Sequence, residues 1–242
     1  MSYLQPRINE SEKIIKEAIE RFGDNLAVGF SGGTDSLVVL NLVLPFKWDV
    51  KCIFVDTNYQ FPETYEYINK LEKDWNLNLI RVKAEPKYDA MVEKYGNETS
   101  EFYLECCRHH KIGPMMRGIK EQGLEAFMVG IRGCEHETRA AEPIFSFKSK
   151  EEFPEMGYDH WRVHPIKNWS MQDVLDYSIL YNLPLNKFIK SCFKIQTDEI
   201  ESPNVLSSIC FSTKLLEIFL RWGFYKQKKL LLIHFIIVLS LI

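Results

Sequence analysis

The chain has 242 residues, a length that suits one large domain or one domain with an appendage. Its composition, with 46% hydrophobic and 26% charged residues, 12 glycines and 10 prolines, excludes collagen-like, low-complexity and wholly disordered proteins. The 30 basic and 33 acidic side chains give a net charge of −3, so no field over the whole chain attracts nucleic acid, and an anionic ligand must be held by a local cluster.

Hydrophobic periodicity predicts alternating helices and strands. Apolar residues at helical spacing from position 14 to 22 predict a first amphipathic helix, which ends at Gly23. Short apolar runs predict buried strands. Ser170 and Asp173 form a capping-box pattern that opens the last predicted helix. In chain order we expect strands at 26–30, 50–55, 77–82 and 126–131, extended pieces at 143–147 and 162–166, and helices at 35–44, 63–75, 111–122 and 170–181.

The alternation of strands and helices predicts the fold class. We expect an α/β fold with a Rossmann-like, mostly parallel sheet and helices on both faces. In such a sheet, ligands bind at the carboxyl ends of the strands.

A glycine-rich loop follows the first predicted strand and directly precedes a helix. Its two glycines allow the backbone to approach an anion closely, and Thr34 or Asp35 is suited to cap the helix, whose free N–H groups point at a phosphate or sulfate. No Gly-Lys-Ser/Thr sequence follows, so the loop is not of the Walker A type. The alternative is an ordinary glycine-rich turn, but the placement favours an oxyanion cradle. The loop consists of Ser31, Gly32, Gly33, Thr34, Asp35 and Ser36.

These residues resemble a known family. SGGTDS, together with VDTNYQFPETYEYI at 55–68, looks like the PP-loop adenine nucleotide α-hydrolase-like superfamily, and specifically its phosphoadenylyl-sulfate reductase family. The similarity continues in CCRHHKIGPM at 106–115, VGIRGCEHETRAAEPIFSF at 129–147 and RVHPIKNWSMQDVLDY at 162–177. The family has a Rossmann-like fold, and its members bind adenylylated sulfate compounds, or ATP when they make them. The resemblance therefore implies an adenine nucleotide as the ligand.

Two groups of residues follow strands that are expected to end near the loop. Asp56 and Thr57 end the second strand, and the resemblance implies that the nucleoside lies near this turn, although Thr57 is also suited to cap the next helix. Gly130, Arg132 and Arg139 follow the fourth strand. Two guanidinium groups on one loop are suited to grip both ends of an adenylyl-sulfate anion, and the alternative is a solvated charged loop.

Other polar residues nearby have less specific expectations. Glu135, His136 and Glu137 lie between the two arginines and are suited to orient them. A second basic cluster, at residues 108–111, is expected at the start of a helix, where positive charge opposes the helix dipole and suggests anion binding. The resemblance gives weight to Arg108 and Lys111 in this cluster. We expect His109 and His110 at the surface, and we expect His164, Trp169 and Tyr177 to be structural.

The adjacent Cys106 and Cys107 separate the functional hypotheses. In the iron–sulfur members of the family, such a pair and a downstream Cys-x-x-Cys hold a four-iron cluster through four thiolates. Here Ile195 stands where the partner of Cys192 would be, so a cluster on Cys106 and Cys107 lacks its second pair unless another protein supplies thiolates. The six cysteines show no regular framework spacing, and the first 25 residues contain no apolar signal segment, so we expect a cytoplasmic protein with reduced thiols.

The composition changes near residue 203. Residues 1–202 contain 25 basic and 32 acidic side chains, a balance of −7, whereas residues 203–242 contain five basic and one acidic, a balance of +4. The final apolar run, 230–242, is shorter than the roughly 17 to 25 residues that a membrane-spanning helix needs. We therefore expect a PP-loop nucleotide-binding domain at 1–202, and an apolar, basic tail at 203–242 that neither spans a membrane nor supplies the catalytic nucleophile.

Three functions remain open. A reductase of adenylyl sulfate or of its 3′-phosphorylated form ranks first, with a thiol donor such as thioredoxin as its partner, because the Cys-Cys pair favours it. An ATP sulfurylase-type adenylyltransferase is the second, favoured by the run ETRAAEPIFSF and by the lack of a clear terminal nucleophile. A nucleotide-binding pseudoenzyme is the third.

Overall fold

The computed structural model describes residues 3–58, 60–85, 88–95, 105–151 and 157–186. These residues contain a six-stranded sheet with the order β3-β2-β1-β4-β6-β5. Only the pairing of β5 with β6 is antiparallel among the strand pairs of this sheet. The expected mostly parallel α/β sheet is confirmed. The strands are β1 (Leu26–Gly29), β2 (Lys51–Asp56), β3 (Asn78–Lys83), β4 (Ala126–Met128), β5 (Phe145–Lys148) and β6 (His160–Val163).

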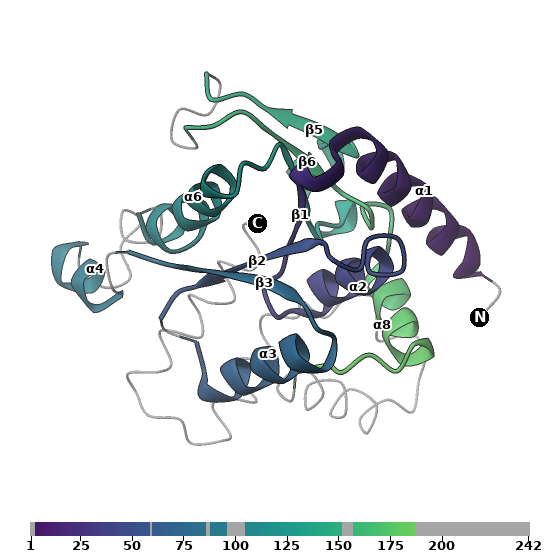
Figure 1. The fold of residues 1–242 in the computed structure, drawn as a ribbon, viewed down its shortest axis with the longest axis horizontal. Helices are drawn as coiled ribbons and strands as arrows, with labels where there is room; N and C mark the ends of the chain where they lie inside the picture. Colours follow the sequence, from purple (N-terminus) through teal and green to yellow (C-terminus); the bar gives the residue numbers. More distant parts are fainter. Residues whose placement is uncertain (1–2, 59, 86–87, 96–104, 152–156, 187–242) are drawn as a thin grey trace.

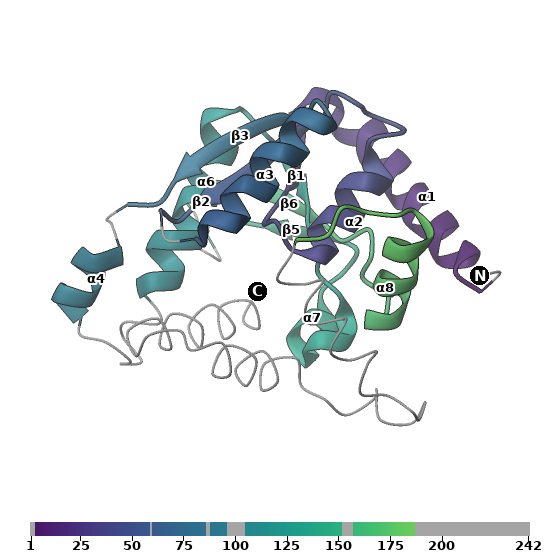
Figure 2. The same ribbon diagram turned by 90° about the horizontal axis from the view of Figure 1, so that it is seen from below.

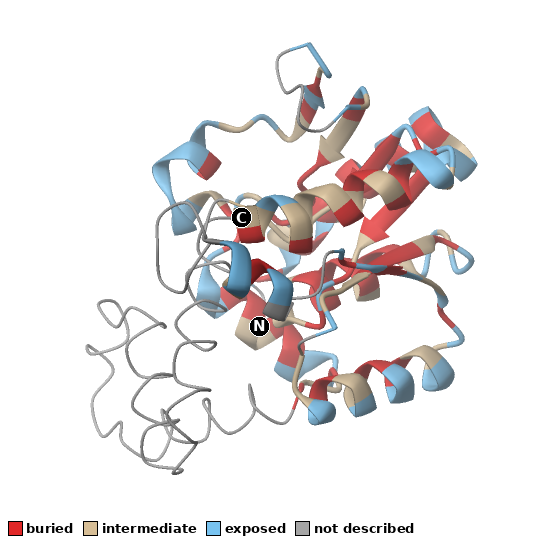
Figure 3. Cartoon of the chain, turned by 90° about the vertical axis from the view of Figure 1, so that its left-hand side faces the viewer, coloured by how far each residue is buried: buried red, intermediate tan, exposed pale blue. Residues whose placement is uncertain are grey.

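Helices cover both faces of the sheet (Figure 1). Side chains of α1, α2, α3 and α8 share one buried cluster with alternate residues of the strands, and α6 contributes to a second cluster with the residues between them. Figure 3 shows the result, with buried strands between helices whose outer faces are exposed. The longer helices are α1 (Gln5–Phe22), α2 (Thr34–Val43), α3 (Pro62–Asp74), α4 (Tyr88–Tyr95), α6 (Gly113–Glu121) and α8 (Met171–Leu180).

Local sequence explains where several of these helices begin and end. Proline occupies the first turn of α1 and of α3, where its missing N–H costs nothing. Gly23, with a φ of 53°, ends α1 as expected. Ser170 and Asp173 form the expected capping box at the start of α8. Figures 1 and 2 both show α4 set apart from the sheet, at the opposite end of the molecule from α1.

Some elements differ from the expectations. The fourth strand ends at Met128 rather than at residue 131, because Gly130 turns the chain toward α2. The expected helix at 111–122 is α6, which is preceded by a π-helical turn, η2 (Arg108–Ile112). The extended pieces at 143–147 and 162–166 form the antiparallel pair β5 and β6 with shifted boundaries. Helix α4 was not expected, nor were three shorter elements: η1 (Gly23–Asn25), η3 (Gly133–Glu135) and α7 (Glu137–Ala141).

The strand order places a topological switch point at β1. The chain leaves β1 and pairs β2 on one side, and it later returns to pair β4 on the other side of β1. In doubly wound sheets, ligands bind at the carboxyl end of such a switch point. The loops that follow β1, β2 and β4 therefore border the candidate site.

Candidate functional site

The glycine-rich loop forms a cradle at the start of α2. Gly32 has a φ of 81°, a conformation that favours glycine. The Ser36 hydroxyl donates to the Gly33 carbonyl at 3.0 Å, and its oxygen accepts from the Ser31 N–H at 3.2 Å. These bonds fix the loop while the first N–H groups of α2 have no acceptor within the helix. This geometry suits a bound oxyanion.

The expectation that Thr34 or Asp35 caps α2 is wrong. The N-cap residue is Gly33, and it makes no side-chain capping bond. Thr34 and Asp35 instead occupy the first turn of the helix, and the Asp35 carboxylate turns toward the loop after β4. Burial raises the pKa of the Asp35 carboxyl, while the neighbouring Arg132 opposes this shift.

Gly130 brings the loop after β4 against the start of α2. A Cβ added at Gly130 would lie 2.7 Å from the carbonyl carbon of Asp35 and 2.8 Å from the backbone nitrogen of Ser36. Both neighbours are backbone atoms, so a larger residue at this position would force the two loops apart. Gly130 therefore serves the site by permitting a close approach of its two main loops.

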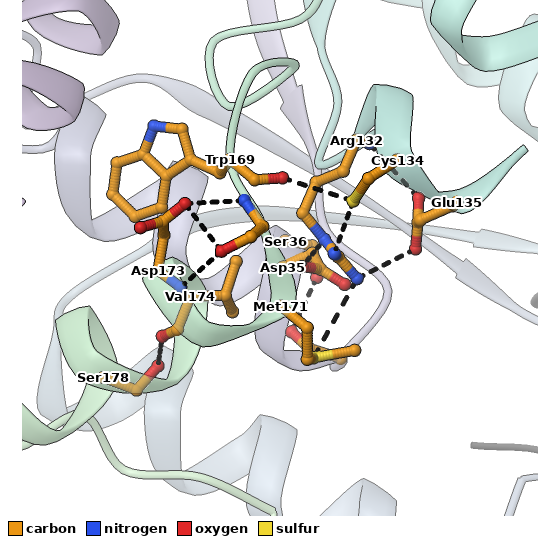
Figure 4. A network of polar contacts seen from close by, with 12 residues as sticks. Asp35, Ser36, Arg132, Cys134, Glu135, Trp169, Met171, Asp173, Val174 and Ser178 are labelled. Atoms are coloured by element: carbon orange, nitrogen blue, oxygen red, sulfur yellow. Dashed lines mark hydrogen bonds and ion pairs between the residues drawn. The ribbon is translucent and has the colours of Figure 1, made fainter. Parts of the chain in front are cut away.

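Arg132 differs from its expected role as a direct ligand of an anion. Its side chain is only 2% exposed, and each of its three nitrogens has a protein partner. Nε donates to Asp35 at 2.8 Å, Nη2 to Glu135 at 3.1 Å and Nη1 to the Cys134 sulfur at 3.3 Å (Figure 4). This arrangement gives Arg132 a place behind the site, where it holds two loops together.

Arg139 lies at the other end of the same network. It lies on α7 and forms an ion pair with Glu135, whose second oxygen pairs with Arg132. Glu135 therefore orients both arginines, as expected. His136 caps α7 by accepting a hydrogen bond from the Thr138 N–H at 3.2 Å, which is a structural role.

Lys111 adds a second cation near Arg139. Burial lowers the pKa of its ammonium group to about 7. The charge of Arg139 also lowers this pKa, whereas Cys107 raises it. Lys111 belongs to the π-helical turn η2, which is a feature common at functional sites. A Cβ at Gly113 would lie 2.8 Å from the Arg108 carbonyl oxygen, so this glycine permits the tight turn.

The other residues of the basic cluster at 108–111 have different surroundings. The cluster was expected at the start of a helix. Residues 105–107 are already helical, so the cluster instead lies within a helical segment. The side chain of Arg108 is 47% exposed and pairs with Glu105 at 2.5 Å, away from Lys111. His109 lies 3.4 Å from the same carboxylate. His110, which was expected at the surface, is buried.

Asp56 and Thr57 lie where β2 ends beside β1. The Asp56 carboxylate accepts from the Asn58 N–H at 2.9 Å and from the Tyr65 hydroxyl at 2.5 Å. These bonds hold the turn, in which Asn58 has a φ of 58°. The alternative role for Thr57, capping the next helix, is wrong, because the N-cap of α3 is Phe61.

The three residues expected to be structural have that role. His164 is buried, and its Nδ1 bonds the Pro143 carbonyl. Trp169 donates its indole N–H to Ser11 at 2.9 Å. Tyr177 donates its hydroxyl to Asn41 at 2.8 Å.

The cysteine pair does not complete a metal site within the described residues. Cys106 is buried, and burial raises the pKa of its thiol to about 12; burial also raises the pKa of the Cys107 thiol. No group of three or more His, Cys, Asp or Glu side chains that could hold a metal ion occurs in this part of the chain. A four-iron cluster needs four thiolates, and Cys106 and Cys107 supply only two of them. Cys192 lies outside the described residues.

The tail at 203–242 also lies outside the described residues, as does the end of the domain expected at 1–202. Within the described part of the chain, no helix is both long enough and apolar enough to cross a lipid bilayer.

Comparisons with known proteins establish the family of the chain. The family model of the phosphoadenosine phosphosulfate reductase domain matches residues 25–195, so the chain belongs to this family. An adenosine 5′-phosphosulfate reductase of Salinibacter ruber is 26% identical over 174 residues, which cover 72% of this chain and 66% of the relative. A phosphoadenosine 5′-phosphosulfate reductase of Vibrio campbellii is 29% identical over 170 residues, which cover 69% of this chain and 62% of the relative. The match thus spans slightly less than two thirds of each of these relatives.

A solved structure supports the fold. The crystal structure of phosphoadenylyl-sulfate reductase from Candida auris, a phosphate complex, superposes with a TM-score of 0.60 at 22% identity. The superposition covers 75% of this chain and 84% of the other.

Proposed function

We propose that the protein binds adenosine 5′-phosphosulfate, or its 3′-phosphorylated form, at the glycine-rich loop and reduces its sulfonate group to sulfite. One observation carries this proposal: Arg139 interacts electrostatically both with Asp35, in the first turn of α2, and with Lys111, so the two cations lie near the uncapped start of that helix. Two neighbouring anion sites suit a ligand that carries a phosphate and a sulfonate. The turn at Asp56 and Thr57 is the place for the nucleoside.

The reduction takes two thiols and proceeds in two displacements. A thiolate attacks the sulfonate sulfur, the bond between this sulfur and the bridging oxygen breaks, and AMP or adenosine 3′,5′-bisphosphate leaves with the electron pair. A second thiol then attacks the sulfur atom of the first thiol, which releases sulfite and forms a disulfide. Both electrons come from the thiols, and a thioredoxin-type donor in the cytoplasm is the partner that we infer.

The residues of the site have separate parts in this reaction. The N–H groups at the start of α2 stabilise the negative charge on the departing phosphate. Lys111 and Arg139 hold the sulfonate oxygens and direct the sulfur toward the incoming thiolate. Among the described residues, none is proposed as the nucleophile.

Adenylyl transfer is the second candidate. Burial raises the pKa of both Cys106 and Cys107, so these thiols are protonated at neutral pH. In adenylyl transfer, a sulfate oxygen attacks the α-phosphate of ATP and pyrophosphate leaves, so no thiolate is needed. The same loop and the same two cations would bind the reactants.

One experiment separates the two candidates. Purified protein is incubated with adenylyl sulfate, reduced thioredoxin and dithiothreitol, and separately with ATP, Mg²⁺ and sulfate. We expect sulfite in the first reaction and no pyrophosphate in the second. Pyrophosphate without sulfite would establish adenylyl transfer instead, and a protein that forms neither product while binding the nucleotide would be a pseudoenzyme.

A further inference from the structure

Four charged side chains of alternating sign connect the glycine-rich loop with Arg139. Asp35, in the first turn of α2, pairs with Arg132; Arg132 pairs with Glu135; and Glu135 pairs with Arg139 on α7. We call these four residues the charge chain. Figure 4 shows its first three members in the space between α2 and the loop after β4.

The two arginines of the charge chain are shielded from solvent, whereas its two carboxylates are more open. The side chains of Arg132 and Arg139 are 2% and 10% exposed, but those of Asp35 and Glu135 are 30% and 26% exposed. A buried guanidinium between two carboxylates is costly to leave unpaired, so the position of Arg132 depends on both partners. Its planar group can hold both carboxylates at once, which a lysine cannot do.

Each contact in the charge chain restricts the position of the next side chain. Glu135 uses Oε1 for Arg132 and Oε2 for Arg139, and Oε2 also accepts from the Arg132 backbone N–H at 3.2 Å. The close approach of Gly130 to Asp35 and Ser36 holds the two loops at a fixed separation. Arg132 therefore has two separate links, one to Asp35 at the glycine-rich loop and one through Glu135 to Arg139.

We propose that Arg132 is a positioning residue that acts through Asp35 on the glycine-rich loop and through Glu135 on Arg139, and thereby holds the phosphate and sulfonate subsites in register. This inference rests on the proposed function, because it needs one ligand that spans both subsites. Arg132 itself does not contact this ligand. Its two links can be cut separately, at Asp35 and at Glu135.

The test measures the affinities for AMP and for adenosine 5′-phosphosulfate, because only the second compound carries the sulfonate. Asp35→Asn cuts the link to the loop, so both affinities should fall by the same factor, about ten-fold, and their ratio should stay constant. Glu135→Gln cuts the link to Arg139, so AMP should bind as before while adenosine 5′-phosphosulfate binds about ten-fold more weakly. Arg132→Met should show both losses together.

Two controls distinguish positioning from general destabilisation. Arg81 on β3 forms an ion pair with Glu72 on α3. Arg81→Met removes this pair, and the affinities for AMP and for adenosine 5′-phosphosulfate should remain unchanged. Arg132→Lys keeps the charge but not the planar group, so it should restore at most one of the two losses. Circular dichroism establishes that each variant is folded, and if Arg132→Met fails to fold, the two single-link variants decide the question.

The outcomes separate this inference from the proposed function. If the unmodified protein binds neither compound, the proposed function is wrong and the inference fails with it. The second case is that the unmodified protein binds both compounds. If Asp35→Asn and Glu135→Gln then each lower the two affinities in the same proportion, or if neither variant changes them, Arg132 does not hold the subsites in register. The proposed function would then stand without this inference.

Discussion

Nε of Arg132 lies 2.8 Å from Oδ1 of Asp35, a carboxylate 97 residues earlier in the chain. This ion pair joins the loop that follows β4 to the first turn of α2. It places the two loops of the switch point in contact, so a ligand held by one of them lies within reach of the residues on the other.

Replacing Gly130 by alanine should push the two loops apart. The new Cβ would lie 2.7 Å from the Asp35 carbonyl carbon, so we expect the free energy of unfolding to fall by about 1–3 kcal/mol and AMP to bind more weakly. Gly133→Ala is the matched control on the same loop, because its Cβ would meet no atom closer than 3.4 Å. Urea titration and AMP titration of both variants provide the measurement. Equal AMP affinity in both variants would show that the close approach at Gly130 is unimportant for the site.

Arg139→Ala should weaken binding of adenylyl sulfate. The substitution removes a charge-assisted hydrogen bond to the sulfonate, worth about 1.5–3 kcal/mol, or roughly ten- to a hundred-fold in the dissociation constant. Arg139→Lys should restore only part of this loss, because an ammonium group cannot form two parallel bonds. Arg7→Ala removes an exposed arginine from an ion pair on α1 and should have no effect. Calorimetric titration gives the constants, and an Arg139→Ala variant that binds as tightly as the control would remove this residue from the site.

The affinity for adenylyl sulfate should fall as the pH rises through about 7. Burial lowers the pKa of Lys111 to about 7, so the side chain carries its charge below this pH and loses it above. A bound anion favours the charged form and raises the pKa of Lys111 in the complex, so the decline should begin near pH 7 and end near this higher pKa. Lys111→Arg should bind with little pH dependence, because arginine keeps its charge over the whole range. Titrations between pH 6 and 9 make the comparison, and parallel profiles for the two proteins would contradict the assignment.

The same group affects stability in the opposite direction. The pKa of Lys111 is lower in the folded protein than the value of 10.5 for an ordinary lysine. Between these two values the unfolded chain binds more protons than the folded one, so the contribution of Lys111 to the free energy of unfolding increases as the pH rises from about 7 to 10.5. Lys111→Met should remove this increase.

Truncation after Ser202 should leave nucleotide binding intact. The tail at 203–242 is basic and apolar, with a charge of +4, whereas the preceding residues carry −7. Its apolar side chains favour self-association, so the truncated protein should be more soluble. AMP titration and light scattering test the two expectations. Loss of AMP binding by a truncated protein that is still folded by circular dichroism would show that the tail belongs to the site.

The sequence was sufficient for the order of elements and for the location of the main loop. The apolar run at 26–28, followed by two glycines and a helical pattern, depends on neighbouring residues only, and β1 and α2 formed as expected. The capping box at Ser170 and Asp173 is local in the same way. The family resemblance also related the later segments, from residue 106 onward, to known sequences, which periodicity alone cannot do.

The roles of individual charges could not be predicted in this way. Arg132 was expected to bind an anion, but its partner Asp35 is 97 residues away, and no local pattern indicates such a contact. His110 is buried and lies in the π-helical turn η2, and hydrophobic spacing does not predict such a turn. Both arginines are buried, with 2% of the Arg132 side chain and 10% of the Arg139 side chain exposed, and this burial results from the packing of the folded chain.

The most direct test of the account is a calorimetric titration of the full chain with adenosine 5′-phosphosulfate, followed by displacement with AMP. We expect one molecule bound per chain, complete displacement by AMP, and a lower dissociation constant for the adenylyl sulfate than for AMP, because in the proposed complex Lys111 and Arg139 contact only the sulfonate. Tighter binding of AMP than of adenosine 5′-phosphosulfate, or binding that AMP does not displace, would contradict a single site built from the glycine-rich loop and these two cations.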